Sequence, residues 1–386
     1  MKILYVTCAN SAGGANIALL NILKNMKKKG YEIMVVTLPG RGPLLNKLDE
    51  WRIEYRQIRL RHNIYPKSPN PILYFPRLFW MLYVNLTAYF KIKKIAQDYK
   101  PDIIHTNVGS ICVGHDVAKK LGIPHVWHHR EYQDLDFDYH FFPTVHSFLR
   151  KTHSKGNYNI CITKGIFNYR NFRENTDKII YDGVFGQEAI KNIPQQKKED
   201  YILFAGRIEK AKGTLELIQA FATLHKTYPN IILNIAGTYH KKDSYYRSCV
   251  QEIRKNNLLD SVHFLGERND IYHLMSKALM LVVPSRFEGF GFITAEAMLN
   301  GCPVIGRNTA GTKEQFDKGL EYTGKEVGLR FNNQEELIQC MKQILKEDSS
   351  EMCEKAKETV IHFYTIEENI RNIEEYYKKI LSIEHK

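Results

Sequence analysis

The sequence lacks the features that mark disulfide-rich, zinc-binding and membrane-spanning proteins. Its seven cysteines lie far apart and form no C-x-x-C pair, so we expect reduced thiols and no zinc site. The first apolar run, residues 3–6, is too short for the core of a signal peptide. Residues 74–90 are the longest apolar stretch, but Pro76, Arg77 and Asn85 interrupt it, and it falls short of about 20 clean apolar residues. We therefore expect a cytoplasmic protein without a transmembrane helix.

Acidic side chains are scarce in the first half of the chain. Residues 1–200 hold 30 Lys and Arg against 17 Asp and Glu, whereas residues 201–386 hold 25 of each. Residues 51–100 alone carry 10 basic and 2 acidic side chains, mixed with aromatic and aliphatic residues. Such a segment is typical either of a peripheral contact with an anionic membrane or of a core helix with a basic solvent face. No nucleic-acid partner is expected, because no nucleic-acid-binding module accompanies the charge.

The order of predicted elements repeats along the chain. Residues 2–7 predict a strand, a glycine-bearing loop follows, and residues 15–29 have the apolar spacing of a helix. Residues 201–205 open a second series of the same kind. Because 386 residues exceed what one hydrophobic core usually holds, we predict two Rossmann-like, doubly wound α/β domains, residues 1–184 and 185–365. Ligands of such sheets bind at the carboxyl ends of the strands, which predicts a site in a cleft between the domains.

The segment PSRFEGFGFITAEAMLNGCPVIGRNTAG, residues 284–311, carries the clearest chemical pattern. Seven residues separate Glu288 from Glu296. The residues that follow Glu288 form a predicted turn and helix start, and they are Gly289, Phe290, Gly291 and Phe292. A helix start offers backbone N–H groups to phosphate, and carboxylates accept hydrogen bonds from sugar hydroxyls. The pattern indicates a nucleotide-sugar site, although an isolated pair of this spacing could equally be two solvated glutamates.

The run SRFEGFGFITAEAMLNGCPVIG strongly resembles the donor-binding signature of retaining glycosyltransferases of the GT-B fold, in particular glycosyltransferase family 4. The resemblance implies that Glu288 contacts the donor sugar and that Glu296 contacts the ribose. FAGRIEKAKG places Arg207 and Lys212 where that family holds the donor diphosphate, and two cations after a buried strand suit pyrophosphate. An ordinary charged surface loop is the alternative for these two. NTAGTKEQF also resembles a segment of the family. The family resemblance as a whole implies that residues 366–386 form a helix returning to the first domain.

The resemblance also implies roles for residues of the first domain. Gly13 and Gly14, at the start of the first helix, would approach the donor phosphates and the reaction centre. The segment PHVWHHREYQDLDFD contains a predicted strand at residues 125–127, after which a histidine would lie near the transferred sugar. We assign this role to His128, with His129 as the alternative, and expect both in a loop at the edge of the cleft.

The residues after these histidines leave two interpretations open. Arg130 and Glu131 would either pair with each other or contact the acceptor. The D-x-D pattern within residues 134–138 is expected to be a solvated loop, because the order of elements does not suit the fold in which that pattern binds a metal.

The predicted function is transfer of a sugar, with retention, from a nucleoside-diphosphate sugar to a hydroxyl of a glycan or lipid-linked acceptor in polysaccharide or surface-glycan biosynthesis. No metal or other cofactor is expected, because Arg207, Lys212 and the helix start would supply the positive charge. A nucleotide-sugar epimerase of the same fold and a non-catalytic scaffold that binds nucleotide sugar are the alternatives.

Overall fold

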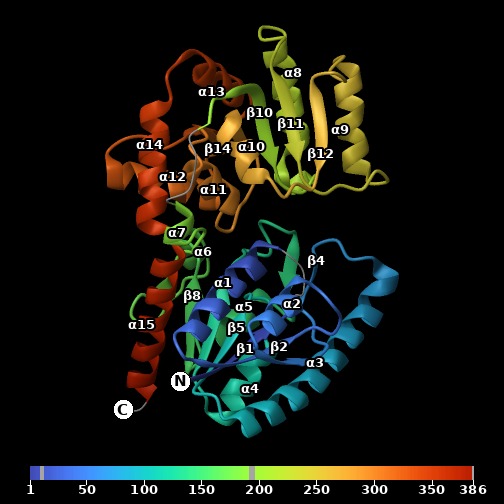
Figure 1. Cartoon of the computed structure of the whole chain (residues 1–386). Helices are drawn as coiled ribbons and strands as arrows, with labels where there is room; N and C mark the ends of the chain where they lie inside the picture. The colour runs from blue at the N-terminus through green and yellow to red at the C-terminus, as the bar shows by residue number, and fades with distance from the viewer. Residues whose placement is uncertain (9–12, 191–195, 385–386) are drawn as a thin grey trace. The chain divides into compact units, whose positions relative to one another are not determined.

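The computed structural model describes residues 1–8, 13–190 and 196–384, and it divides the chain into two units (Figure 1). Unit 1 comprises Met1–Gly183 together with the residues from Ile366 onward, and unit 2 comprises Val184–Thr365. The division lies one residue before the expected boundary between residues 184 and 185. Part of the polar stretch that follows this boundary, residues 191–195, lies outside the described residues.

Unit 1 is built on a parallel sheet with the strand order β3-β2-β1-β5-β6-β8-β9. Its strands are β1 (Lys2–Thr7), β2 (Glu32–Thr37), β3 (Glu54–Gln57), β5 (Ile103–Asn107), β6 (His125–His129), β8 (Asn157–Cys161) and β9 (Lys178–Ile179). The central strands are buried along their whole length, as expected of a sheet that is covered on both faces. The order of the first six strands is that of a Rossmann sheet, and it reverses direction between β1 and β5.

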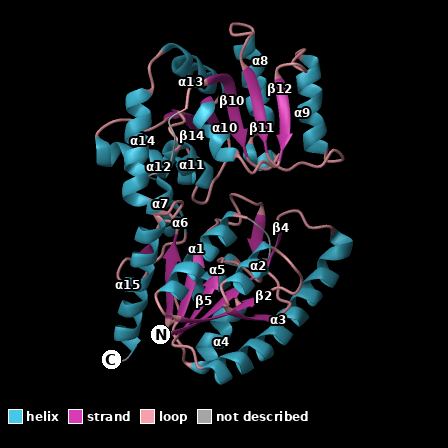
Figure 2. Cartoon of the chain, viewed as in Figure 1, coloured by secondary structure: helices cyan, strands magenta, loops and turns pink. Residues whose placement is uncertain are grey.

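Helices cover both faces of this sheet (Figure 2). Apolar residues of α1 (Gly14–Lys28), α2 (Pro43–Glu50) and α15 (Ile366–Glu384) form one core with the strands. Residues of α3 (Pro71–Tyr99) and α4 (Val113–Leu121) form the core on the opposite face. The remaining elements of the unit are α5 (Val145–Thr152), α6 (Lys164–Tyr169) and a small antiparallel pair, β4 (Ile64–Pro66) with β7 (Tyr139–Phe141).

The last helix, α15, belongs to the core of unit 1 although it is distant in sequence. Its inward side chains, Ile373, Tyr377 and Ile380, are fully buried. The hydroxyl of Tyr377 lies 3.1 Å from that of Tyr5 on β1, and Tyr31 donates a hydrogen bond of 2.8 Å to Glu374. The helix therefore completes the hydrophobic layer over β1.

Unit 2 contains a second parallel sheet, with the order β12-β11-β10-β13-β14-β15. Its strands are β10 (Glu199–Ala205), β11 (Ile232–Ala236), β12 (Val262–Gly266), β13 (Ala278–Val283), β14 (Val304–Arg307) and β15 (Leu329–Phe331). This is again the Rossmann order, and it reverses between β10 and β13. Loops leaving these two strands turn to opposite faces of the sheet and leave space between them for a ligand.

The helices of unit 2 also form two layers. One layer contains α8 (Thr214–His225), α9 (Ser244–Lys255) and α13 (Gln334–Lys346), which share a core with the strands. The other contains α10 (Ile271–Lys277), α11 (Phe292–Leu299), α12 (Ala310–Thr323) and α14 (Ser350–Phe363) (Figure 2). A short helix, α7 (Gln187–Ile190), precedes the sheet. In the described part of the chain, no helix is both long enough and apolar enough to cross a membrane.

Ile373→Ala tests how far unit 1 depends on α15. Because Ile373 is 0% exposed, we expect the free energy of unfolding of unit 1 to fall by about 3 kcal/mol. All three tryptophans, at positions 51, 80 and 127, lie in unit 1, so denaturation followed by tryptophan fluorescence reports this unit. The exposed neighbour Glu375→Ala is the control, with an expected change of less than about 0.5 kcal/mol. Equal effects of the two substitutions would contradict the packing described.

Candidate functional site

Two loops leave the adjacent central strands of unit 2 and contact each other. The first, residues 206–213, follows β10, and the second, residues 284–291, follows β13. The backbone N–H of Arg286 donates to the carbonyl of Ala211 at 3.0 Å, which joins the two loops directly. Both loops therefore lie at the carboxyl ends of the strands, where the strand order reverses.

Two glycines make the close approach of these backbones possible. Gly213 has φ +72°, and a β-carbon there would lie 2.5 Å from the carbonyl oxygen of Pro284. At Gly311, near the start of α12, a β-carbon would lie 2.3 Å from the carbonyl oxygen of Phe290. A larger residue at position 213 would push the two loops apart, and one at position 311 would push α12 away from the second loop.

An ion pair joins the two loops at the side-chain level. Lys212 Nζ lies 2.7 Å from Glu288 Oε1, and the two side chains are only 23% and 16% exposed. The sequence placed both residues in the donor site, and the structure brings them into contact. Arg207, on the same loop as Lys212, is 59% exposed and pairs with Glu209 at 3.1 Å. The two predicted phosphate-binding cations thus differ: Lys212 is held beside a carboxylate, whereas Arg207 extends into solvent.

The turn between Glu288 and α11 is held in place by hydrogen bonds from α12. Gly291, with φ +87°, precedes the first residue of α11. The amide of Gln315 donates to the carbonyls of Phe290 and Gly291 at 2.6 and 3.0 Å. Phe290 is buried, and its ring lies 5.2 Å from that of Phe292. The turn is therefore fixed while the first N–H groups of α11, which have no acceptor within the helix, remain available at its start.

Glu296 lies in the second turn of α11 and is half-buried. Removal from water raises the pKa of its carboxyl group, and a hydrogen bond from Tyr272 opposes this change. The Tyr272 hydroxyl donates to Glu296 Oε1 at 3.2 Å. The ring of Tyr272 is 44% exposed and lies 5.3 Å from that of Phe185. Glu296 is thus an oriented acceptor beside a partly exposed aromatic ring.

Sequence analysis missed three residues that support this site. No sequence pattern marks Tyr272 as part of the site, because a tyrosine in a short helix has no typical functional spacing. Gln315 supports the turn, and Thr309 donates to the carbonyl of Arg286 at 2.7 Å. Both belong to the NTAGTKEQF segment, so the resemblance marked this segment without assigning roles to its side chains.

In unit 1, Gly13 and Gly14 begin the first helix as expected. Gly13 precedes α1 with φ −71°, and Gly14 is its first residue. A β-carbon at Gly13 would meet no atom within 4 Å, so neither its backbone conformation nor its neighbours require glycine. Residues 9–12 of the same loop lie outside the described residues.

The expectation that His128 and His129 lie in a loop is wrong. Both belong to β6, because backbone pairing with β8 continues to the end of the strand, where His129 is opposite Cys161. Successive residues of a strand point to opposite faces, so the two histidines have different surroundings. His129 contacts Asn159 at 2.9 Å and stacks obliquely on Phe172.

His128 lies on the other face, beside a buried polar cluster. Its ring centroid is 5.4 Å from that of His105, and its Nδ1 is 3.4 Å from a guanidinium nitrogen of Arg130. His128 is fully buried, and its Nε2 has no hydrogen-bond partner among the described residues. Burial and the charge of Arg130 hold the pKa of His128 well below its usual range.

Arg130 is buried and forms its ion pair with Asp182. Its Nε also donates to Asn107 at 2.8 Å. Burial raises the pKa of Asp182, and the guanidinium of Arg130 opposes that shift. Glu131 accepts a hydrogen bond of 2.5 Å from Gln133. Arg130 is therefore engaged by a partner that sequence analysis did not identify.

The aspartates of the D-x-D segment each have a partner of their own. Asp134 accepts from Tyr169 at 2.6 Å, and Asp138 lies 3.2 Å from Lys67. Asp136 accepts from the backbone N–H of Tyr132 at 2.8 Å. Throughout the described ranges, no three His, Cys, Asp or Glu side chains are grouped so that they could hold a metal ion.

Two family models match the sequence. Residues 186–362 match the model described as glycosyl transferases group 1, and residues 12–169 match glycosyltransferase family 4. The first range contains all the donor-site candidates of unit 2. The second contains the candidates of unit 1, from Gly13 to Glu131.

Known proteins resemble the chain over its whole length or over part of it. N-acetyl-alpha-D-glucosaminyl L-malate synthase of Bacillus anthracis is 23% identical over 97% of this chain and 96% of its own. An N-acetylgalactosaminyltransferase of Campylobacter jejuni, which acts on N-acetylgalactosamine-N,N'-diacetylbacillosaminyl-diphospho-undecaprenol, is 29% identical over 47% of each chain. The structure of Anabaena HepE in complex with UDP aligns with a TM-score of 0.76 at 21% identity, covering 98% of this chain and 100% of that one. The fold is therefore the GT-B fold that the resemblance implied.

Gly213→Ala tests the contact between the two loops. Alanine with a positive φ lowers stability by about 1 kcal/mol at any site, and the clash with Pro284 should lower that of unit 2 by about 1–3 kcal/mol more. Gly324→Ala is the matched control, because its φ is +70° and no atom lies within 4 Å of its added β-carbon. Denaturation followed by far-UV circular dichroism measures the loss of stability in each of the two variants. Equal losses would show that the loops can separate freely.

The buried histidines of unit 1 predict a loss of stability in weak acid. Burial lowers the pKa of His105 to about 3 and that of His129 to about 4, whereas an unfolded chain takes up these protons near pH 6.5. Below about pH 6.5 the unfolded state binds more protons than the folded state. The free energy of unfolding therefore decreases by about 1.4 kcal/mol for each such histidine with every unit by which the pH is lowered. Tryptophan fluorescence during denaturation from about pH 7 to about pH 5 measures this slope.

His129→Gln should reduce this slope by the share of one histidine. The exposed His240→Gln in unit 2 should leave it unchanged. A profile for the wild type that is flat over this range would contradict the assignment of neutral, buried imidazoles.

Proposed function

Because the chain belongs to the group 1 glycosyltransferases and to glycosyltransferase family 4, we propose that it transfers a sugar, with retention, from a nucleoside-diphosphate sugar to a hydroxyl of a glycan or lipid-linked acceptor. One observation is the main support for placing the donor site in unit 2. The Lys212–Glu288 ion pair joins two loops at the reversal of the strand order, beside the start of α11. A cation, a carboxylate and free helix N–H groups together match a diphosphate joined to a sugar.

The donor-site residues have distinct roles in this proposal. Lys212 and Arg207 bind the diphosphate, and Glu288 then accepts hydrogen bonds from the sugar hydroxyls. Glu296 accepts from the ribose hydroxyls. The hydrogen bond from Tyr272 to Glu296 supports that role, since it leaves the second carboxylate oxygen for the ligand. The glycines at 289 and 291 allow the phosphates close to the backbone.

The reaction proceeds by attack on the face of the sugar from which the diphosphate leaves. The bond between the anomeric carbon and the diphosphate oxygen breaks, the acceptor oxygen bonds to that carbon on the same face, and the acceptor proton passes to a diphosphate oxygen. Arg207, Lys212 and the N-terminal end of α11 stabilise the negative charge that develops on the leaving group. These groups provide positive charge without a metal ion, so we propose metal-independent transfer.

Unit 1 binds the acceptor in this proposal. Gly13 and Gly14 approach the donor phosphates, and His128 contacts the sugar or the phosphate side. Because Arg130 is engaged by Asp182, it holds the end of β6 in place and shapes the surroundings of His128, while Glu131 meets the acceptor. The Campylobacter jejuni relative, which uses a diphospho-undecaprenol acceptor, supports a role in surface-glycan biosynthesis.

The donor site is tested by calorimetric titration of UDP, GDP and ADP, in EDTA, into the wild type and Glu296→Gln. We expect one nucleotide to bind and the substitution to weaken its binding about tenfold, because a carboxylate forms stronger hydrogen bonds to hydroxyls than an amide does. Glu335→Gln, an exposed site elsewhere in unit 2, should bind like the wild type.

The titration, followed by incubation with the matching nucleotide sugar, separates the alternatives. Binding that requires a divalent ion would contradict metal independence, and no binding of any nucleotide would contradict the donor site. Consumption of the matching nucleotide sugar without an acceptor, with a rearranged sugar as product, would indicate an epimerase. Binding with no chemical change in the presence of glycan or lipid-linked acceptors would indicate a scaffold.

A further inference from the structure

The helix α3 has two apolar faces, of which only one is covered. Ala88, Ile92 and Ala96 point inward and join the core with α4. On the opposite side, large apolar side chains recur every three or four residues along the helix. These residues, called the α3 stripe, are Ile72, Phe75, Phe79, Leu82, Leu86 and Phe90, and their exposed fractions lie between 42% and 82%.

The α3 stripe concentrates the exposed apolar surface of the molecule. Across the described ranges, 20 large hydrophobic residues are exposed, and nine of them lie between residues 72 and 90. Single exposed apolar residues are common, but a contiguous patch indicates an interaction surface. The stripe runs from residue 72 to residue 90, 18 steps along the helix, or about 27 Å at about 1.5 Å per step. The helix α3 forms one edge of unit 1 in Figure 1.

The charged side chains in the sequence around the α3 stripe are all basic. No Asp or Glu occurs from residue 55 to residue 97. Lys91 and Lys94 are exposed at the C-terminal end of the stripe. Near its other end, Arg61 and Arg77 line a cavity of about 500 Å³ with Tyr74 and Trp80. Guanidinium groups beside aromatic side chains suit phosphate at an apolar boundary.

We propose that the α3 stripe binds the interfacial region of an anionic lipid bilayer. Apolar side chains flanked by cations are the composition of a helix that lies in the plane of a membrane surface. A second copy of the chain is the less favourable partner, because two such surfaces would bring like charges together. The inner face of α3 is packed on α4, so the helix lies on the bilayer without crossing it.

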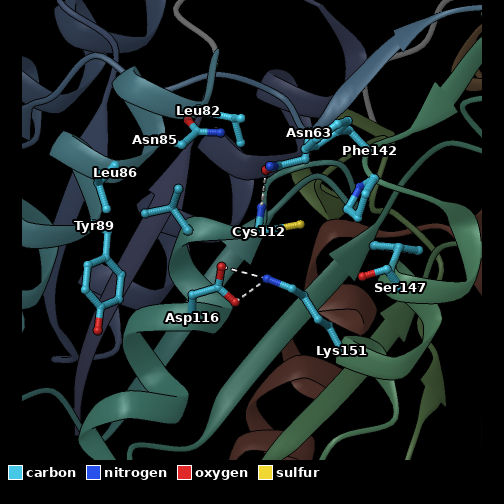
Figure 3. A pocket seen from close by; sticks show the side chains of 13 residues that line it. Asn63, Leu82, Asn85, Leu86, Tyr89, Cys112, Asp116, Phe142, Ser147 and Lys151 are labelled. Atoms are coloured by element: carbon cyan, nitrogen blue, oxygen red, sulfur yellow. Dashed lines mark hydrogen bonds and ion pairs between the residues drawn. The ribbon is translucent and has the colours of Figure 1, made fainter. Parts of the chain in front are cut away.

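A second cavity, of about 530 Å³, borders the stripe (Figure 3). Leu82 and Leu86 belong to both the stripe and the wall of this cavity. Farther along its lining, Lys151 donates to Asp116 at 2.7 Å. The lining thus changes from apolar at the stripe to charged beyond it, which is the order of environments that an amphiphile meets on leaving a membrane.

Vesicle flotation tests the proposal with the full chain. The wild type should float with phosphatidylcholine vesicles that contain phosphatidylglycerol, and it should not float with phosphatidylcholine alone. Phe79→Ser/Leu86→Ser should reduce the bound fraction at least about tenfold, because two large side chains lose their burial in lipid. Leu259→Ser is the matched control, since Leu259 in unit 2 is 61% exposed and Leu86 57%.

A second variant tests the electrostatic contribution to membrane binding. Lys91→Gln/Lys94→Gln should weaken binding by about tenfold or more, given the attraction of each lysine to an anionic surface. Lys241→Gln/Lys242→Gln, two exposed lysines in unit 2, should bind like the wild type. Circular dichroism of each variant verifies its fold.

Three results would overturn the proposal. They are a wild type that stays at the bottom with anionic vesicles, stripe variants that float like the wild type, and light scattering that shows a wild-type dimer and a monomeric Phe79→Ser/Leu86→Ser variant. The last result would assign the stripe to a second copy. None of these measurements depends on nucleotide binding, so they are independent of the proposed transfer.

Discussion

The reversal of strand order between β10 and β13 is the constraint on which the candidate donor site depends. Two neighbouring parallel strands end at the same edge, and their loops then turn toward opposite faces of the sheet. At this edge of the sheet, a cation in the loop after β10 can meet a carboxylate in the loop after β13. Gly213 allows the two loop backbones to approach, and the Lys212–Glu288 ion pair joins their side chains. The same reversal occurs between β1 and β5 of unit 1, so one architectural rule organises both halves of the chain.

The periodicity of the sequence predicts most of these elements because parallel strands are continuous apolar runs and glycine ends many helices. The predicted strand at residues 2–7 is β1, and the predicted helix at residues 15–29 differs from α1 by one residue at each end. The end of β6 was misplaced, since polar residues such as His128 and His129 lack the apolar signal of a buried strand. They are tolerated there because partners from distant segments, such as Asn159, surround them. Pairing of this kind cannot be read from local sequence.

The candidate site shows the same division between local and distant information. The spacing of Glu288 and Glu296 and the basic loop at residues 207–212 are local patterns, and the resemblance gave them a meaning. The ion pair of Lys212 with Glu288, the hydrogen bond from Tyr272 to Glu296 and the capture of Arg130 by Asp182 join residues far apart in the chain. They depend on the fold. In the proposed transfer they would act through orientation, because an acceptor or a cation that is already held in place needs less reorganisation when a charge develops.

The position of α15 in the core of unit 1 has a consequence for biosynthesis. Unit 2 is continuous in sequence and can fold as soon as it leaves the ribosome, since domains generally fold as units during synthesis. Unit 1 begins first but is complete only after α15 has been synthesised, because Tyr377 and Ile380 belong to the core that covers β1. Until then, part of its apolar layer faces water. Unit 2 can therefore be complete before unit 1, and the early half of the chain is the one whose apolar layer stays exposed longer.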